Sequence, residues 1–299
     1  MYGDIAHLLP EQHIRWNEPM KNHTSFRIGG PADCMVFPST VSQVLEVVSW
    51  CRARGIPYLV IGKGSNLLVR DKGIRGVVIK LGEIFCDLTV TGNMLHAQAG
   101  ALLSRAARLA AQHGLTGLEF AEGIPGSVGG AVFMNAGAYG GEMKDVVYEV
   151  QAMDDQGNLR TMQKPELGFG YRRSVFQDNG FVILAVHMAL QPGNTEEIRE
   201  RMAEFARRRE EKQPLEFPSA GSTFKRPEGY FVGPLIEELG LKGLQVGGAQ
   251  ISAKHAGFII NTGNAKAADV LELIRIVQAR VRESKGIDLQ PEIRIVGED

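Results

Sequence analysis

Two glycine-rich stretches decide the fold of this chain: Gly62-Lys63-Gly64-Ser65-Asn66 and Gly123-Ile124-Pro125-Gly126-Ser127-Val128-Gly129-Gly130. The second continues into Asn135-Ala136-Gly137-Ala138-Tyr139-Gly140. Because glycine has no Cβ, backbone N–H groups in such loops can approach a bound anion closely. The small hydroxyl and amide side chains among the glycines can hydrogen-bond to phosphate oxygens without a lysine or a magnesium ion. The pattern therefore predicts a site for a diphosphate or a dinucleotide.

The common phosphate-binding templates do not fit the first stretch. A P-loop needs Ser or Thr where this chain has Gly64, and a glycine where it has Pro57. The fingerprint of a Rossmann fold needs a third glycine or an alanine at the position of Leu67. Either loop alone could be only a tight turn, but two such loops together weaken that alternative. We expect a different scaffold to hold the ligand.

Hydrophobic periodicity around the two stretches predicts a chain of mixed helices and strands. Helices are expected at 41–54 with Thr40 as N-cap, and at 101–112, 195–212, 233–239 and 267–284. Strands are expected at 58–61, 77–79, 146–150, 181–186, 258–260 and 292–296. A hairpin turn is expected at 153–158, with Gly157 and Asn158 at positive φ. This order predicts an α+β fold in three domains, 1–81, 82–194 and 195–299.

Composition points to a globular protein that acts on small molecules in the cytoplasm. Hydrophobic residues make up 44% of the chain, and the net charge of −1 lacks the basic excess of a nucleic-acid-binding protein. The first residues have no signal-peptide pattern and no apolar run is long enough for a membrane span, so we expect no membrane partner. Cys34, Cys51 and Cys86 are expected to be reduced and mostly buried, and histidine spacing predicts no metal site.

Six ordered motifs in the chain are similar to those of the UDP-N-acetylenolpyruvoylglucosamine reductase (UDP-N-acetylmuramate dehydrogenase) family. They are NHTSFRIGGPA at 22–32, GKGSNLL at 62–68, IPGSVGG at 124–130, GYRRS at 170–174, AGSTFK at 220–225 and PEIR at 291–294. The resemblance runs from about residue 22 to residue 297. Flavoproteins similar to vanillyl-alcohol oxidase share the motif at 124–130, so the last three motifs carry the assignment to this family.

The resemblance implies a two-part FAD-binding unit of the vanillyl-alcohol-oxidase (PCMH) type, followed by a C-terminal α+β domain that binds substrate. It implies that NADPH reduces non-covalently bound FAD, and that hydride then passes from flavin N5 to C3 of UDP-N-acetylglucosamine enolpyruvate. The product is UDP-N-acetylmuramate, a precursor of bacterial peptidoglycan, which links the protein to cell-wall biogenesis, cell shape and cell division. The residues expected to hold FAD are Gly62, Lys63, Gly64, Ser65, Asn66, Leu67, Gly126, Ser127, Gly129, Gly130, Asn135, Ala136 and Gly137.

Three residues match the catalytic positions of the family. Hydride arriving at C3 pushes negative charge toward C2 and the carboxylate, where a fixed cation and a hydrogen-bonding acid would stabilise it. Arg172 and Glu292 match these two roles, and Ser222 matches the proton donor to C2. The candidate substrate contacts are Tyr171, Lys212, Arg226 and His255. Without the match to the order of the family's motifs, simpler interpretations would apply. Ser222 would be a turn serine, Arg172 would belong to a solvated pair with Arg173, and Glu292 would begin a strand.

The short separation of Tyr171 and Ser222 resembles the shorter form of the family, which lacks the substrate-closing tyrosine loop. The basic run at 207–209 is either a solvated helix face or a contact, with Lys212, to the UDP diphosphate. One alternative function is an FAD-linked oxidase of a sugar or a phenol, which would use O₂ and would not need Ser222 or Glu292. Another is a nucleotide-binding or flavin-storage module. The oligomeric state is not predicted.

Overall fold

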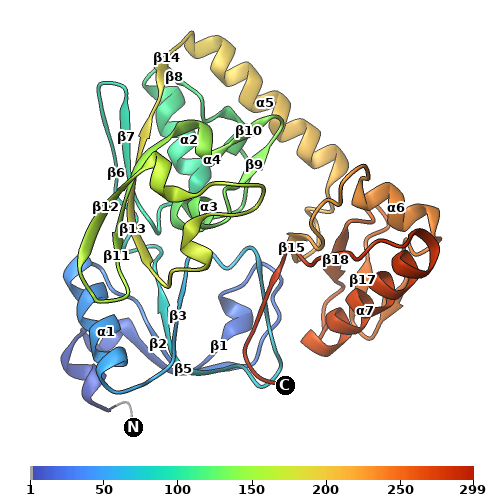
Figure 1. Ribbon diagram of the computed structural model, residues 1–299, viewed down its shortest axis with the longest axis horizontal. Helices are drawn as coiled ribbons and strands as arrows, with labels where there is room; N and C mark the ends of the chain where they lie inside the picture. Colours follow the sequence, from blue (N-terminus) through green and yellow to red (C-terminus); the bar gives the residue numbers. More distant parts are fainter. Residues whose placement is uncertain (1–2) are drawn as a thin grey trace. The chain divides into compact units, whose positions relative to one another are not determined.

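The computed structural model describes residues 3–299 (Figure 1). Met1 and Tyr2 lie outside the described residues. They are the first two residues of the predicted domain 1–81 and of the N-terminal segment that has no signal-peptide pattern. Contacts divide the chain into two compact units. The first contains the residues up to Trp16 together with 34–63 and 76–209, and the second contains 17–33, 64–75 and 210–299. Helices and strands occur in both units, which confirms the predicted α+β class.

One four-stranded sheet carries the first glycine stretch at the end of a strand. Its order is β1 (Ile14–Pro19), β2 (Pro31–Val36), β5 (Ile74–Lys80) and β3 (Tyr58–Ile61), and β3 pairs with β5 in parallel. Helix α1 (Val41–Ala53) precedes β3. As predicted, Thr40 caps α1, because its side chain accepts a hydrogen bond from Gln43 N at 3.2 Å. The predicted strand 58–61 is confirmed and runs directly into Gly62.

A five-stranded antiparallel sheet forms the rest of the first core. Its order is β12 (Leu159–Gln163), β11 (Val147–Met153), β13 (Val182–Ala189), β7 (Met94–Gln98) and β6 (Leu88–Thr91). Helices α2 (Leu103–Gln112) and α3 (Val128–Phe133) pack on this sheet, and both lie on the same side of it in Figure 1. Helix α2 begins two residues later than predicted, because Leu102 is bridged to Ser127 and Leu103 N donates to Gly126 O.

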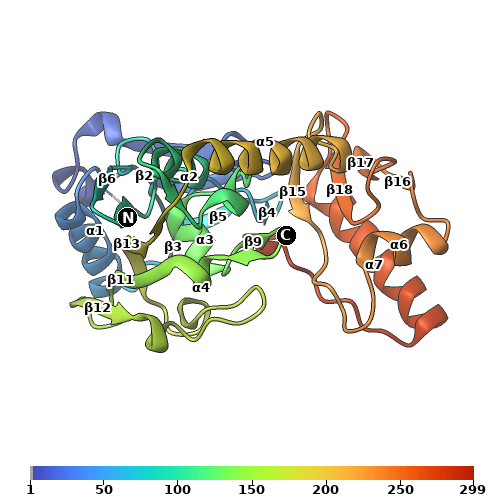
Figure 2. The same cartoon turned by 90° about the horizontal axis from the view of Figure 1, so that it is seen from above.

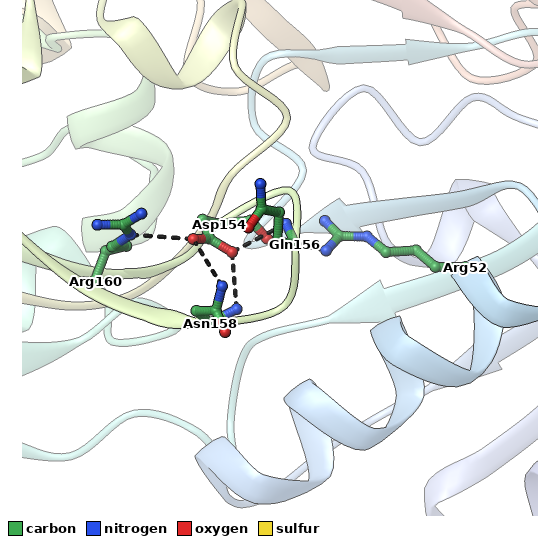
Figure 3. Close-up of polar contacts among 5 residues, drawn as sticks. All are labelled: Arg52, Asp154, Gln156, Asn158 and Arg160. Carbon is green, nitrogen blue, oxygen red and sulfur yellow. Dashed lines mark hydrogen bonds and ion pairs between the residues drawn. The ribbon is translucent and has the colours of Figure 1, made fainter.

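The predicted hairpin at 153–158 joins β11 to β12 and is organised by Asp154 (Figure 3). This buried carboxylate accepts hydrogen bonds from Gln156 N at 3.0 Å and Asn158 N at 2.8 Å, and from Arg160 Nε at 3.1 Å. Gly157 adopts φ +92° as predicted. The predicted positive φ at Asn158 is wrong, because the Asp154 side chain holds this residue in place without a left-handed turn.

Helix α5 (Thr195–Lys212) has the predicted bounds, but most of it packs with the first unit. Ile198 and Met202 are buried in the first core, and Arg201 Nη1 lies 3.3 Å from Glu119 Oε1. The three domains 1–81, 82–194 and 195–299 stay a prediction. The two compact units divide the chain differently, because 17–33 and 64–75 belong to the second unit and 195–209 belong to the first.

The second unit contains a four-stranded antiparallel sheet in the order β15 (Ser219–Ser222), β18 (Phe258–Asn261), β17 (Ala249–Ile251) and β16 (Gln245–Val246). Helix α7 (Ala267–Lys285) packs on β16 and β17, and α6 (Val232–Glu238) lies beside α7 (Figures 1 and 2). The last strand, β19 (Arg294–Val296), does not join this sheet. It pairs in parallel with β4 (Leu67–Val69), directly after the first glycine stretch.

Several short elements complete the described structure. The remaining strands and the short helix are β8 (Leu115–Thr116), β9 (Gly137–Ala138), β10 (Gly141–Glu142), β14 (Gln191–Pro192) and α4 (Met143–Val146). Single turns of 3₁₀ helix occur at Gly3–His7, Glu11–His13, Met20–Asn22, Glu119–Ala121, Lys164–Leu167 and Val175–Gln177. Cys34 and Cys51 are buried and Cys86 is half-buried. Burial raises the pKa of the Cys51 thiol to about 11. From residue 3 to residue 299, no helix is long and apolar enough to cross a membrane.

Candidate functional site

The second glycine stretch leads into α3, and Ser127 caps this helix. Ser127 Oγ accepts a hydrogen bond from Gly130 N at 3.3 Å. The N–H groups of Val128 and Gly129 donate to Ala101 O and Ala99 O, both at 2.8 Å. The expectation that open backbone N–H groups bind the anion is therefore wrong at the start of α3. The Ser127 hydroxyl still carries a proton that it can donate to an anion.

Glycine is required at Gly62 because Ser127 lies against it. A Cβ at Gly62 would lie 2.0 Å from Ser127 Oγ, so the structure brings these two predicted cofactor residues together. Gly129 is equally close to the neighbouring backbone, since a Cβ there would lie 2.7 Å from Ala99 Cβ. Lys63 and Gly130 are exposed and Gly126 is half-buried. In the first unit, small residues thus let the end of β3 and the start of α3 approach closely.

Asn135 is fully buried, and its side chain is occupied by the protein itself. Its Nδ2 donates to Glu142 Oε2 at 3.0 Å and to Gly170 O at 2.9 Å, and its Oδ1 accepts from Lys144 N at 2.9 Å. The geometry therefore differs from the predicted role of a neutral donor to a phosphate. Ala136 and Gly137 follow in the same turn, and a Cβ at Gly137 would lie 2.6 Å from Glu142 Cγ.

The Asn135 contact to Gly170 fixes the turn that carries Arg172. Gly170 and Arg173 exchange two backbone hydrogen bonds of 3.0 and 3.1 Å, which places Tyr171 and Arg172 at the tip of a tight turn. Arg172 adopts φ +53°, a left-handed conformation that costs free energy in a residue with a Cβ and is often found at functional sites. Its Nη2 lies 3.3 Å from Gly137 O, and its guanidinium lies 5.1 Å from the Tyr171 ring.

In the second unit, residues 64–66 of the first glycine stretch contact two motifs that are distant in the sequence, 22–32 and 291–294. Gly64 adopts φ +71°, and a Cβ there would lie 2.1 Å from His23 O. Its carbonyl accepts a hydrogen bond from Ser25 N at 3.2 Å. Asn66 Nδ2 donates to Glu292 O at 3.1 Å, and Asn66 O accepts from Arg294 N at 2.9 Å. Ser65 is half-buried, and Leu67 is the first residue of β4.

Ser222 and Glu292 are neighbours within the second unit, although they are far apart in the sequence. Ser222 is the last residue of β15 and pairs with Phe258. The next residue, Thr223, donates its N–H to Gly257 O at 2.9 Å and accepts a hydrogen bond from Glu292 N at 2.8 Å. Both side chains are half-buried. The structure thus places the predicted proton donor one residue from the backbone contact of the predicted acid.

The predicted substrate contacts fall in both units. Tyr171 belongs to the first unit and is 50% exposed, and Lys212 is exposed at the end of α5 in the second. Arg226 donates to Tyr230 O at 3.3 Å, and its guanidinium lies 3.9 Å from the Phe231 ring. His255 Nδ1 accepts a hydrogen bond from Gly257 N at 3.1 Å. Burial is the largest influence on His255 and lowers its pKa, so a neutral imidazole is present at pH 7.

The sequence gives no sign that Glu142 and Gly170 are partners of Asn135, or that Thr223 links Ser222 and Glu292. No local signal marks these contacts, because each joins segments that are separated in the chain. Over residues 3–299, no three His, Cys, Asp or Glu side chains gather in a group that could hold a metal ion.

Comparisons with known proteins identify the relatives of the chain. Residues 32–163 match the family model described as an FAD binding domain, and residues 213–296 match that of the UDP-N-acetylenolpyruvoylglucosamine reductase C-terminal domain. A UDP-N-acetylenolpyruvoylglucosamine reductase of Syntrophomonas wolfei is 54% identical over 299 residues, which cover 100% of both chains. One of Caldanaerobacter subterraneus is 51% identical, over 98% of this chain and 97% of its own.

A solved structure is also similar. The crystal structure of UDP-N-acetylenolpyruvylglucosamine reductase from Thermus caldophilus has 42% sequence identity and a TM-score of 0.81, and the match covers 93% of this chain and 97% of that one. The match to an FAD binding domain spans both glycine stretches, which confirms the predicted FAD-binding unit. The residues fit this cofactor, because glycine at 62 and at 137 lets neighbouring segments of the two stretches approach closely, and Ser127 offers a neutral donor beside Gly62.

Proposed function

Because the chain belongs to the UDP-N-acetylenolpyruvoylglucosamine reductase family, an FAD-dependent oxidoreductase family, we propose that it reduces UDP-N-acetylglucosamine enolpyruvate to UDP-N-acetylmuramate with NADPH as electron donor. We place this reaction in the cytoplasmic synthesis of peptidoglycan precursors, which connects it to cell shape and cell division. The contact that carries the proposal is the 2.8 Å hydrogen bond from Glu292 N to Thr223 O, because it holds the two most specific motifs of the chain together.

Small residues of the two glycine stretches would hold the FAD pyrophosphate. The Ser127 hydroxyl supplies a donor beside Gly62, and Gly137 provides a close approach of the backbone. Asn135 acts indirectly, since its amide fixes Gly170 and the loop at Gly137 rather than reaching a ligand. In the second unit, Asn66 ties the first stretch to Glu292. The FAD held there would supply the hydride chemistry between NADPH and C3 of the enolpyruvyl group.

The protein residues manage the charge that follows. Arg172 presents a fixed cation at the tip of a strained turn, where it would neutralise the substrate carboxylate. Glu292 would hydrogen-bond to the same carboxylate as negative charge develops there. Ser222 would donate its hydroxyl proton to C2 and form the lactyl ether. A serine hydroxyl is a weak acid, so this step requires the strongly basic C2 carbanion as acceptor.

Stopped-flow absorbance of the anaerobic holoenzyme tests this function. NADPH should bleach the flavin, and UDP-N-acetylglucosamine enolpyruvate should restore its colour in the absence of oxygen. In Ser222→Ala the bleaching should keep its wild-type rate, whereas the return of colour should slow by about 100- to 10,000-fold because the proton donor is missing. Ser219→Ala is the matched control, since it lies on the same strand and should leave both rates unchanged.

Two results would reject the proposal. If colour returns only with oxygen, the protein is an oxidase rather than a reductase of the enolpyruvyl sugar. If Ser222→Ala restores colour as fast as the wild type does, Ser222 is not the proton donor.

A further inference from the structure

Strand β15, which ends at Ser222, contains a β-bulge. Ser219 pairs with Ile260 of β18 and Ser222 pairs with Phe258, so β15 has two residues between these pairs where β18 has one. Gly221 lies inside the bulge and adopts φ +78°. A bulge leaves one residue outside the ladder and turns the neighbouring side chains. The ladder alone therefore does not fix the direction of the Ser222 hydroxyl.

Hydrogen bonds from outside the β15–β18 ladder hold both ends of this bulge. After the bulge, Thr223 N donates to Gly257 O at 2.9 Å, and Thr223 Oγ1 accepts from Ile259 N at 3.1 Å. Before the bulge, Ser25 Oγ donates to Ser219 O at 2.6 Å. The second anchor comes from a residue 194 positions earlier in the chain. The position of Ser222 between the two anchors depends on both of them.

Ser25 also contacts the first glycine stretch. Its N–H donates to Gly64 O at 3.2 Å, so one residue connects all three separate stretches that make up the second unit. The loop of Ser25 is fixed in turn by Asn261, which is 3% exposed and donates from Nδ2 to Phe26 O at 3.1 Å. Ser25 thus joins a segment expected to bind FAD to the strand that carries the expected proton donor.

The two donors of Ser25 place different demands on the sequence. Any residue except proline could supply the N–H to Gly64 O, because that donor belongs to the main chain. Only a hydroxyl side chain at this position supplies the short bond to Ser219 O. The side chain of Ser25 therefore contributes the anchor of the bulge, and its removal leaves the contact to the glycine stretch in place.

We propose that Ser25 is a positioning residue for proton transfer, whose hydroxyl anchors the start of the bulge and thereby directs the Ser222 hydroxyl toward C2 of the substrate. The inference rests on the proposed function, in which Ser222 gives its proton to C2. A proton donor must lie within about 2.6–3.2 Å of the atom that it serves. A misplacement of about 1 Å can slow a reaction by about 100-fold.

Stopped-flow absorbance of the anaerobic holoenzyme tests the inference in Ser25→Ala. Bleaching by NADPH should keep its wild-type rate, whereas the return of colour with UDP-N-acetylglucosamine enolpyruvate should slow by about 10- to 100-fold, because Ser222 is no longer held in reach of C2. Ser25→Thr restores the hydroxyl and should recover most of the rate. Thr262→Val is the matched control, because it removes a hydroxyl bond to another carbonyl of the same unit, that of Gly248 at 2.9 Å, and should leave both rates unchanged.

A double variant shows whether Ser25 acts through Ser222. If it does, adding Ser25→Ala to a chain that already carries Ser222→Ala should slow the return of colour by less than about twofold. Equal slowing in both backgrounds would overturn the inference. So would a wild-type return of colour in Ser25→Ala, or a slow one that Ser25→Thr does not recover.

A second substitution covers the case in which Ser25→Ala does not fold. Ser25→Cys keeps a side chain of similar size but offers a weaker donor on a longer bond, so the return of colour should slow by about threefold or more. A wild-type rate in this variant would overturn the inference. If the wild type itself recovers no colour without oxygen, the proposed function fails, which separates that result from a failure of the role of Ser25.

Discussion

Asn135 connects three backbone segments through one buried amide. Its Nδ2 binds the Glu142 carboxylate and the Gly170 carbonyl, while its Oδ1 binds the N–H of Lys144. The left-handed backbone at Asn135, with φ +42°, is tolerated because asparagine is among the residues that adopt this region most readily. Through Gly170, this amide determines where the turn that presents Arg172 lies.

Replacing Asn135 with Ala should destabilise the chain rather than only weaken cofactor binding. The substitution leaves the Gly170 carbonyl and the Lys144 N–H without their partner, so the free energy of unfolding should fall by about 2–4 kcal/mol. Urea denaturation of the apoprotein measures this. Asn93→Ala, at an exposed position of the same unit, is the control and should change the free energy by less than about 0.5 kcal/mol. Unchanged stability with lost FAD binding would instead make Asn135 a direct ligand.

Asp154 shows how hydrogen bonds can outweigh burial at a single carboxylate. Burial alone would raise its pKa. Hydrogen bonds from the Asn158 backbone, the side chains of Arg160 and Asn158, and the Gln156 backbone favour the charged form and together lower the pKa from 3.8 to about 2 (Figure 3). The charged carboxylate therefore stabilises the β11–β12 hairpin at every pH above the pKa that Asp154 has in the unfolded chain.

The stability contributed by Asp154 should be lost in acid. Because its folded pKa is lower than its unfolded pKa, the contribution is complete above about pH 4 and declines as the pH falls toward 2. Asp154→Asn lacks this titration. The melting temperature of the variant should be lower than that of the wild type at pH 6, and the difference should shrink between pH 4 and pH 2. A constant difference over this range would show that folding does not lower the pKa of the Asp154 carboxyl.

At the scale of elements, glycine at 62 lets the end of β3 lie in contact with the start of α3. A Cβ at Gly62 would lie 2.0 Å from Ser127 Oγ and 2.9 Å from Ser127 Cβ. We expect Gly62→Ala to lose FAD, because the added methyl group pushes Ser127 and α3 away from β3. Ser127→Gly in the same chain removes both clashing atoms, so the double variant should regain part of its FAD absorbance at 450 nm. If the double variant binds no more FAD than Gly62→Ala, the loss has another cause.

Among residues 3–299, local pattern was enough to predict five of the seven α-helices and six of the nineteen strands. The capping hydroxyl of Thr40 located the start of α1, and the charged repeat of 195–212 located both ends of α5. Strands β15 and β16 were not predicted, because the sequence of β15 is Ser-Ala-Gly-Ser and β16 has only two residues, so neither contains an apolar run. The last strand was predicted at 292–296 but begins at Arg294, since Glu292 uses its N–H to bind Thr223.

At the scale of the whole molecule, the second unit is assembled from three separate stretches, 17–33, 64–75 and 210–299. The parallel pairing of β4 with β19 joins two of them, and Asn66 binds Glu292 beside that pairing. Family motifs named Ser222 and Glu292 as candidates, but only the pairing of distant segments brings them together. Periodicity describes neighbours in sequence and cannot reveal such contacts. For the same reason, the sequence predicts that Asn135 contacts a ligand and gives no sign of its hydrogen bond to Gly170.

FAD should stabilise the whole chain through its diphosphate. A ligand that binds only the folded state raises the free energy of unfolding by about 2.7 kcal/mol when its free concentration is a hundred times its dissociation constant. Removing FAD should therefore lower the urea midpoint of the protein, and adding FAD back should restore it. Riboflavin carries the same ring without the diphosphate, so at equal concentration it should restore much less, because the Ser127 hydroxyl beside Gly62 is expected to hold phosphate oxygens. If riboflavin restores the midpoint as well as FAD does, the two glycine stretches are not a diphosphate site, and the ring alone accounts for binding.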